Sequence, residues 1–185
     1  MTKSKDNIKT YTGIFFNPLQ IREEHIAIQD IAHSLSMQCR GGGHIRHFFS
    51  VAQHSINCAL EARAREYSRR VQLACLLHDA SEAYISDITR PVKRQLLQYM
   101  EIEKVIQDQV WNAHFREPLG EEELEQVTEI DEAMLYHELE YLLGVKVEEE
   151  VPVLARALHL ETVEFGKVES SFMEMFEELC HEKTL

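Results

Sequence analysis

Helix-breaking residues are scarce in this sequence, which has 7 glycines and 4 prolines among 185 residues. Long helices can therefore form over most of the chain. The sequence also lacks the roughly 18 consecutive uncharged apolar residues that a bilayer-spanning helix requires. Its beginning, "MTKSKDNIKTYTG", has no apolar stretch typical of a signal peptide. We therefore expect a cytoplasmic protein with no membrane partner.

Positive charge is in short supply, because 19 Lys and Arg stand against 32 Asp and Glu, for a formal net charge of −13. The acidic excess is concentrated in the last third, in runs such as "EEELEQ" and "KVEEEV", which are typical of solvated helix faces. Such a surface repels a nucleic-acid polymer. A small anion can still bind where a few basic residues gather, since salt screens distant charge. We therefore expect a small-molecule partner.

Cysteine pairs of the Cys-x-x-Cys type are absent, although the chain has 4 cysteines. We expect reduced thiols in the core and no disulfide framework. Hydrophobic residues make up 44% and charged residues 28%, which is typical of a chain that folds. The length suits one core, so residues 1–185 are predicted to form a single domain.

Apolar residues recur at helical spacing along most of the chain. Helices are expected over 31–39 with Asp30 as N-cap, 51–66 with Ser50 as N-cap, 69–85, from Pro91 to 115, 121–143 before Gly144, and in one or two segments after Pro152. The exception is "IKTYTGIFFNPL", whose β-branched and aromatic residues predict a short β-hairpin or extended arm. The predicted fold class is all-α, a compact helical bundle.

Two of these helices are expected at the centre of the bundle. The helix over 51–66 carries a stripe of small residues suited to close packing, namely Val51, Ser55, Cys58, Ala59 and Ala62. The helix over 69–85 is almost entirely apolar for the seven residues before His78, which favours burial on all sides.

Ionisable side chains follow that apolar run in "LLHDASEAYISDITRPVK". On a helix, Glu82 lies four residues from His78 and three from Asp79, so the three side chains can converge on one edge. A His-Asp pair alone is a weak signal in a chain with 10 histidines. The pair gains weight only if other metal-binding residues join it.

Two residues from other helices are candidates to join the pair. His54 lies among small residues in "SVAQHSINCA", and Asp131 lies among apolar residues in "TEIDEAMLY", where a carboxylate needs a partner. Two histidines and two aspartates suit one divalent ion of Co, Mn, Zn, Fe or Ni, with Mg as a further candidate. His54 could instead be a core histidine, and Asp30 or Glu138 could be the last ligand.

Four blocks in order carry a family resemblance: "DIAHSLSMQCRGGGHIRHFF", "SVAQHS", "LLHDASEAYISDITRPVK" and "EIDEAMLYHE". From about Thr12 to about Leu143 the chain resembles the small HD-domain phosphohydrolases, which include bacterial 5'-deoxynucleotidases and phage dATP triphosphohydrolases. The resemblance implies a compact helical bundle with one metal ion. Its ligands, in the family's H…HD…D order, would be His54, His78, Asp79 and Asp131.

The resemblance also implies roles for residues around the metal. Glu82 would be the catalytic acid, Arg40 would grip the substrate phosphate during catalysis, and Asp87 and Lys93 would form part of the substrate wall. Two of these residues also have simpler structural explanations: Asp87 could cap a turn, and Arg40 could stabilise the end of a helix.

The residues after Arg40 depart from the family, whose members commonly have a bulky residue there. This chain reads Gly41-Gly42-Gly43-His44. The glycines could open the pocket or let backbone N–H groups approach phosphate. Gly41 and His44 are therefore predicted to bind substrate, although His44 could also be solvated.

The expected activity is removal of phosphate from deoxynucleotides. A divalent cation lowers the pKa of bound water from about 15.7 toward 7 and polarises the phosphoryl oxygen. A deoxynucleoside triphosphate, dATP first, ranks ahead of a deoxynucleoside monophosphate, the substrate of a 5'-deoxynucleotidase. A non-catalytic regulatory module that binds metal or nucleotide is the remoter alternative. Relatives form dimers or larger rings, so a homo-oligomer, a dimer or hexamer, is also implied.

Overall fold

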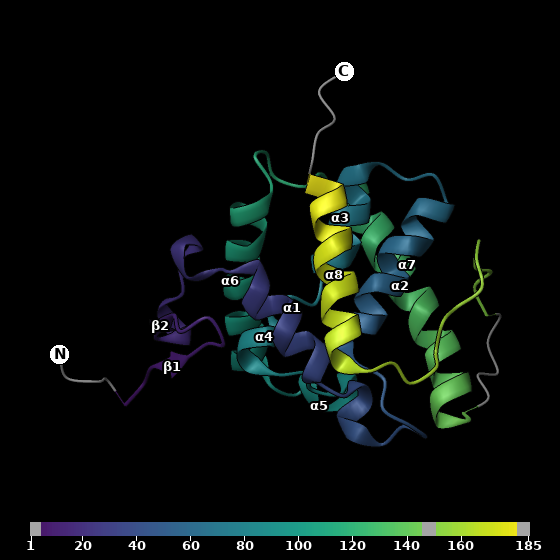
Figure 1. The fold of residues 1–185 in the computed structure, drawn as a ribbon, viewed down its shortest axis with the longest axis horizontal. Helices are drawn as coiled ribbons and strands as arrows, with labels where there is room; N and C mark the ends of the chain where they lie inside the picture. The colour runs from purple at the N-terminus through teal and green to yellow at the C-terminus, as the bar shows by residue number, and fades with distance from the viewer. Residues whose placement is uncertain (1–4, 146–150, 181–185) are drawn as a thin grey trace.

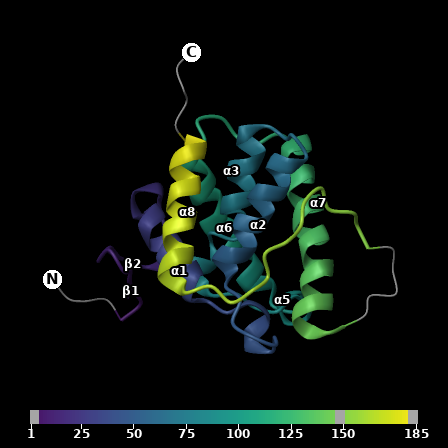
Figure 2. The same cartoon turned by 45° about the vertical axis from the view of Figure 1, so that its right-hand side comes forward.

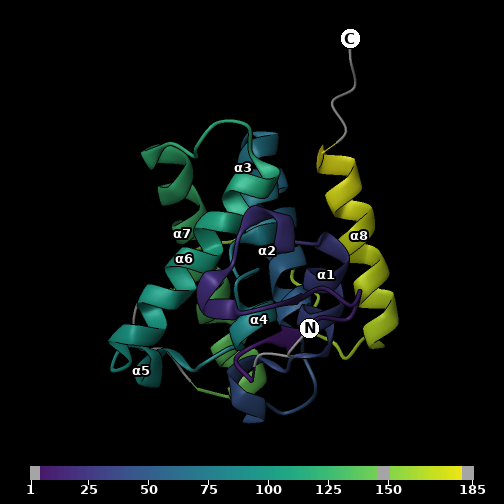
Figure 3. The same ribbon diagram turned by 90° about the vertical axis from the view of Figure 1, so that its left-hand side faces the viewer.

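The computed structural model describes residues 5–145 and 151–180, and these are mostly helical (Figure 1). Near the N-terminus, β1 (Ile8–Lys9) pairs antiparallel with β2 (Phe15–Phe16), which confirms the hairpin. Gly13 lies in its turn with a φ of +95°, a conformation that favours glycine. The ring of Phe16 packs edge-on against Tyr84, so the hairpin covers that part of the bundle (Figure 3).

The helices follow the predicted order. They are α1 (Ile28–Met37), α2 (Val51–Ala64), α3 (Arg69–Leu77), α4 (Glu82–Ile85), α5 (Arg90–Lys93), α6 (Leu97–His114), α7 (Glu121–Glu138) and α8 (Phe165–Cys180). Short 3-10 turns lie at Pro18–Gln20, Glu23–His25 and Arg40–Gly43, and a π-helical turn, Leu139–Leu143, continues α7. Gly144 ends that turn in the left-handed conformation, as its position in the sequence predicted.

The centre of the bundle is the pair α2 and α3, which pack against each other more extensively than other elements do. Helices α1, α7 and α8 pack around this pair (Figure 1). All seven residues from 71 to 77 are buried, which confirms that α3 is central. The main cluster of buried apolar residues extends from Phe16 in the hairpin to Leu179 in α8.

Helix α2 begins as predicted and presents small residues to its neighbours. The Ser50 hydroxyl oxygen accepts a hydrogen bond from the Gln53 backbone N–H, and the Gln53 side-chain oxygen accepts one from the Ser50 backbone N–H. Ala59 and Ala62 are at most 2% exposed. Because small side chains let helix axes approach closely, α2 can bring a polar side chain such as His54 next to the end of α3.

The segment 69–85 is not the single helix that was expected. Helix α3 ends at Leu77 and α4 begins at Glu82, so His78 and Asp79 lie in the turn between them. Gln107 of α6 explains the break: its amide donates to the Leu77 carbonyl and its oxygen accepts from the Ser81 N–H. These bonds replace helical ones, and their source is distant in sequence.

The segment after Pro91 was also wrongly expected to be one helix. Pro91 lies in the first turn of α5, as predicted, but α5 ends at Lys93 and α6 begins at Leu97. The residues between them form turn hydrogen bonds, such as Leu96 N–H to the Lys93 carbonyl.

Asp30 is not the N-cap of α1, because the helix already begins at Ile28. Its buried carboxylate accepts hydrogen bonds from the backbone and hydroxyl of Thr12, at 2.7 and 2.8 Å. Asp30 therefore ties the hairpin arm to α1, a role that depends on a contact across 18 residues of sequence.

All four cysteines are free thiols, as expected, but they do not all belong to the core. Cys58 and Cys75 are buried, Cys39 is half-buried and Cys180 is exposed near the end of α8. None of the helices in the described ranges, 5–145 and 151–180, is both long and apolar enough to cross a bilayer.

After Pro152 the chain runs without helix until α8, and it covers α2 (Figure 2). Gln53 and Asn57 of α2 donate to the carbonyls of Glu161 and His159, each at 3.0 Å. The buried carboxylate of Glu61 accepts from the Ala155 N–H at 2.8 Å. Polar side chains of α2 thus satisfy backbone groups of this segment.

The close packing of α2 predicts a cost for overfilling it. Ala59→Leu should lower the free energy of unfolding by about 1–3 kcal/mol, because the buried site has no room for three more carbon atoms. Urea denaturation followed by circular dichroism measures this. Ala64→Leu on the exposed side of α2 is the matched control and should change stability by less than about 0.5 kcal/mol. Equal effects of the two substitutions would contradict the packing.

Candidate metal centre

The four predicted metal ligands come together where α2, the end of α3 and α7 meet. His54 on α2 is fully buried, and its Nε2 lies 3.2 Å from Nε2 of His78. The same nitrogen lies 3.1 Å from Oδ1 of Asp131 on α7 and 3.7 Å from Oδ2 of Asp79. His78 Nε2 is 3.4 Å from the Asp79 oxygen and 3.6 Å from the Asp131 oxygen.

These separations fit donor atoms that share one cation. Bonds of about 2.0–2.2 Å to a divalent metal, at tetrahedral or octahedral angles, place neighbouring donors roughly 2.8–3.6 Å apart. Four of the five distances given above lie between 3.1 and 3.6 Å, and the fifth, from His54 Nε2 to Asp79 Oδ2, is 3.7 Å. The two imidazoles and two carboxylates are therefore arranged in a way that could accommodate a metal ion.

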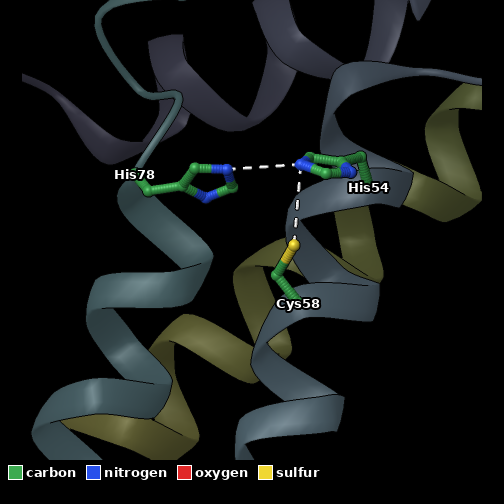
Figure 4. Close-up of side chains that lie close together, drawn as sticks. All are labelled: His54, Cys58 and His78. Carbon is green, nitrogen blue, oxygen red and sulfur yellow. Dashed lines mark hydrogen bonds between the residues drawn. The ribbon is translucent and has the colours of Figure 1, made fainter. Parts of the chain in front are cut away.

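Cys58 is a further potential donor that the sequence did not single out. It lies one turn after His54 on α2, with its Sγ 3.5 Å from His54 Nε2 (Figure 4). His54, Cys58 and His78 together form a group that could hold a metal ion. Burial raises the pKa of the Cys58 thiol to about 11, so it is protonated near neutral pH, whereas metals bind the thiolate. Its spacing from His54, one helical turn, was the available signal.

The carboxylates are better suited to balance a cation's charge. Burial by itself raises the pKa of Asp131, but hydrogen bonds with His54 and His78 hold it well below its usual value. The pKa of Asp79 is also lowered, because the charges of His78 and Arg40 outweigh the effect of burial. Both aspartates are therefore ionised at neutral pH.

Both histidines direct Nε2 toward the centre because Nδ1 is already engaged. Nδ1 of His78 lies 2.7 Å from the Cys75 carbonyl oxygen, which can only accept, so Nδ1 carries the proton. Nδ1 of His54 lies 2.6 Å from Oε1 of Glu138. Bonds of this kind fix the orientation of metal-binding imidazoles. Glu138 therefore lies behind His54 and not in the place of a last ligand.

Arg40 borders the centre from the turn that follows α1. Its guanidinium contacts Oδ2 of Asp79 at 3.3 Å and Oε2 of Glu138 at 3.2 Å, with 14% of the side chain exposed. Burial opposes its charge, but Glu138 and Asp79 outweigh that effect and raise the pKa of Arg40. A permanent positive charge thus lies beside the candidate ligand Asp79 and beside Glu138.

Glu82, at the start of α4, is a buried carboxyl close to the centre. It is 3% exposed, and its Oε2 has no hydrogen-bond partner among the described residues. Burial, followed by the charges of Asp79 and Asp87, raises its pKa well above the usual value. The ammonium group of Lys93 is 4.0 Å from Oε1. A buried polar atom without a partner is costly, so this oxygen is placed to meet a water or a ligand.

The remaining predicted substrate residues are placed differently from one another. Burial raises the pKa of Asp87, while a hydrogen bond from the Gly41 backbone opposes that shift, so Asp87 and Gly41 lie together. Asp87 is not the N-cap of α5, which is Thr89. His44 is exposed, and its side chain makes no hydrogen bond or ion pair within the described part of the chain. Its role stays a prediction.

A basic side chain that was not predicted to belong to the site also contacts it. Arg90, the first residue of α5, contacts Oδ2 of Asp131 at 3.1 Å, and its side chain is 42% exposed. An open groove of about 860 Å³ begins at the same centre and runs along α6; its lining includes His78, Asp79, Lys93, Gln107, Trp111 and Phe115. The groove is large enough to receive a small molecule.

The fold and this centre define a mostly helical protein with a candidate site for one metal ion. Over 99 residues the chain is 43% identical to an uncharacterized protein of Escherichia coli K12, YfdR; the match covers 54% of this chain and 53% of YfdR. Over 72 residues it is 43% identical to an uncharacterized protein of Rhodobacter capsulatus, with 37% of each chain covered. The chain thus spans about half or less of the length of these relatives. No family model matches.

The centre predicts that the metal-free protein loses stability as pH rises. Burial lowers the pKa of His54 and His78, but neighbouring acidic groups outweigh it and raise both above the ordinary 6.5. A raised folded-state pKa contributes stability that is complete below pH 6.5 and is lost as pH rises through that pKa. The melting temperature in chelator should therefore fall between pH 6 and 8.5, by about 2 °C or more.

Metal should reverse this trend, because its histidine ligands must be neutral. The difference in melting temperature between Co²⁺-loaded and chelated protein should widen over the same pH range. A chelated protein whose melting temperature stays constant or rises from pH 6 to 8.5 would contradict the charge arrangement described here.

Proposed function

We propose that this protein is a cytoplasmic, metal-dependent phosphohydrolase of the HD-domain type that removes phosphate from deoxynucleotides. The observation that carries the proposal is the convergence of His54, His78, Asp79 and Asp131: the two imidazole Nε2 atoms lie 3.2 Å apart and 3.1–3.7 Å from an oxygen of each aspartate. Arg40 and Glu82 lie largely buried beside these ligands, and the binding of a metal ion alone would require neither of them.

In this proposal one divalent transition ion, such as Co, Mn, Zn, Fe or Ni, is held by the two imidazoles and two carboxylates. When bound, the ion supplies Lewis-acid chemistry that makes a water more acidic and polarises a phosphoryl oxygen. The two ionised aspartates match the charge of the ion.

Arg40 serves in this proposal to bind the phosphate group that is cleaved. A guanidinium has five N–H donors, and the two contacts to Asp79 and Glu138 leave others for phosphate oxygens. Those same contacts hold the guanidinium beside the metal ligands. A phosphate that reaches Arg40 is therefore also beside the candidate ion, where its P–O bond is cleaved.

Glu82 serves in this proposal as the proton-transferring group. Its Oε2 has no partner among the described residues, and its raised pKa keeps the carboxyl able to carry a proton near neutral pH. A carboxyl in this state can protonate a leaving oxygen and accept a proton from water in the return step. The charges of Arg40 and of Lys93, the latter 4.0 Å away, limit how far the pKa of Glu82 rises.

The preferred substrate class is a deoxynucleoside triphosphate, with dATP first. Arg90, paired with Asp131, and Lys93, paired with Glu103, place basic side chains on α5 next to the centre, and their remaining N–H donors favour a substrate with several phosphates. Gly41, His44 and Asp87 are proposed to contact the rest of the nucleotide. A 5'-deoxynucleotidase acting on monophosphates is the second candidate. Of the three basic residues Arg40, Arg90 and Lys93, Arg40 is the one whose guanidinium is largely buried beside the ligands, and one such group suits a single phosphate.

We also propose a homo-oligomer, a dimer or hexamer. Several apolar side chains of α5, α6 and the link between them are 41–71% exposed, and they are Val92, Leu96, Leu97, Met100 and Val105. Such a surface favours association between copies of the chain.

A substrate panel tests the proposal directly. Deoxy- and ribonucleoside mono-, di- and triphosphates are incubated with protein loaded with Mn, Co, Mg or Zn, and the products are separated by chromatography. We expect hydrolysis of deoxynucleotides that disappears in chelator, with dATP converted to deoxyadenosine and triphosphate. Binding without turnover across the whole panel would favour a regulatory module instead.

The role of Glu82 predicts a specific loss. Glu82→Gln should reduce kcat by about 100-fold or more, because the amide keeps the shape of the side chain but cannot transfer a proton. Metal content, measured by elemental analysis, should equal that of the wild type because Glu82 is not a proposed ligand. Glu101→Gln on the exposed face of α6 is the control. A Glu82→Gln protein with wild-type kcat would refute the role.

A further inference from the structure

We propose that Glu138 is a positioning residue that sets the orientation of His54 for metal binding and, through the same carboxylate, holds Arg40 in place for phosphate. This inference rests on the proposed metal centre. It concerns a residue that is neither a predicted ligand nor a predicted catalytic group.

The contacts of Glu138 are short and buried. Its Oε1 lies 2.6 Å from Nδ1 of His54 and its Oε2 lies 3.2 Å from Nη2 of Arg40. The His54 side chain is fully buried and that of Glu138 is 5% exposed. Charge-assisted hydrogen bonds of this kind are stronger than neutral ones, and water cannot readily replace them here.

These contacts determine which nitrogen of His54 faces the centre. An ionised carboxylate can only accept, so Nδ1 carries the proton in its bond to Glu138. In the neutral ring that a metal requires, the lone pair is then on Nε2, on the side where the oxygens of Asp79 and Asp131 lie. Without Glu138 the ring could rotate about its side-chain bonds, and Nε2 would no longer be fixed.

One helix provides the groups on both edges of this imidazole. Asp131 and Glu138 are two helical turns apart on α7, and they lie 3.1 Å from Nε2 and 2.6 Å from Nδ1 of His54 respectively. The α-helix changes to a π-helical turn directly after Glu138. Such turns occur frequently at functional sites, where they adjust the direction of side chains.

His78 shows that the two histidines are oriented by different means. Its Nδ1 donates to the backbone carbonyl of Cys75, a contact within one turn of chain that no substitution removes. His54 instead depends on a side chain 84 residues away. Substitution of Glu138 therefore removes the Nδ1 contact of His54 while the His78 contact stays in place.

The shared carboxylate links metal binding to phosphate binding. Since Arg40 contacts Asp79 with one nitrogen and Glu138 with the other, loss of Glu138 leaves the guanidinium with one acidic partner beside the centre. A substitution should therefore weaken metal affinity and raise the KM for nucleotide together. A residue that only stabilises the fold would change the melting temperature and leave both constants unchanged.

The test measures the dissociation constant for Co²⁺, by competition with a chelating dye, for the full chain and its variants. Glu138→Ala should weaken Co²⁺ binding by about 10–100-fold, the usual effect of losing a partner of a metal-binding histidine. Glu138→Gln should weaken it by about threefold or more, because the amide oxygen still accepts from Nδ1 but lacks charge. Glu132→Gln, exposed on the same helix, is the control.

Two measurements separate this inference from the proposed function. Melting temperatures identify the variants that fold. If Glu138→Ala does not fold, Glu138→Gln tests the positioning role. Folded variants with Co²⁺ dissociation constants and KM values within twofold of the wild type would overturn the positioning role, even if the wild type hydrolyses nucleotides. A wild type that binds Co²⁺ but hydrolyses no nucleotide would overturn the proposed function, and the comparison of dissociation constants would still decide the role of Glu138.

Discussion

The burial of charged groups around His54 is the constraint on which the rest of this structure depends. An isolated charge in a protein interior is costly, and this centre contains several acidic side chains, two imidazoles and a guanidinium. They are tolerated because each contacts a group of opposite charge, as Arg40 does with Asp79 and Glu138. The close approach of α2, α3 and α7 is what allows these contacts.

Basic side chains gather near the candidate centre although the protein as a whole is acidic. The net charge is −13, yet Arg40 and Arg90 contact the candidate ligands Asp79 and Asp131, and Lys93 lies beside Glu82. The acidic residues that begin α7, Glu121 and Glu122, are exposed. Solvent and salt screen such distant charges, whereas the three cations act at short range. Local arrangement, and not net charge, decides what the centre can attract.

The helices were predictable from sequence because their apolar spacing reflects burial on one side, and Ser50 and Gly144 marked two boundaries through local capping. The interruptions were not predictable. Where α3 ends at Leu77, the side chain of Gln107, 30 residues away, bonds the Leu77 carbonyl and the Ser81 N–H, the two groups that a continued helix would join. Aspartate is a common N-cap residue, but the carboxylate of Asp30 instead accepts a hydrogen bond from Thr12 of the hairpin arm. In both places a contact between distant segments replaced a local hydrogen bond.

By itself the sequence determined the mostly helical class, the N-terminal hairpin and the residue types of the candidate centre, because spacing and composition are local properties of the chain. Only the tertiary structure decided that Glu138 contacts Nδ1 of His54, that the Cys58 sulfur lies near its Nε2, and that Arg90 reaches Asp131. Those facts depend on how closely and at what rotation helices pack. Many residues share such an arrangement, and no short stretch of sequence records it.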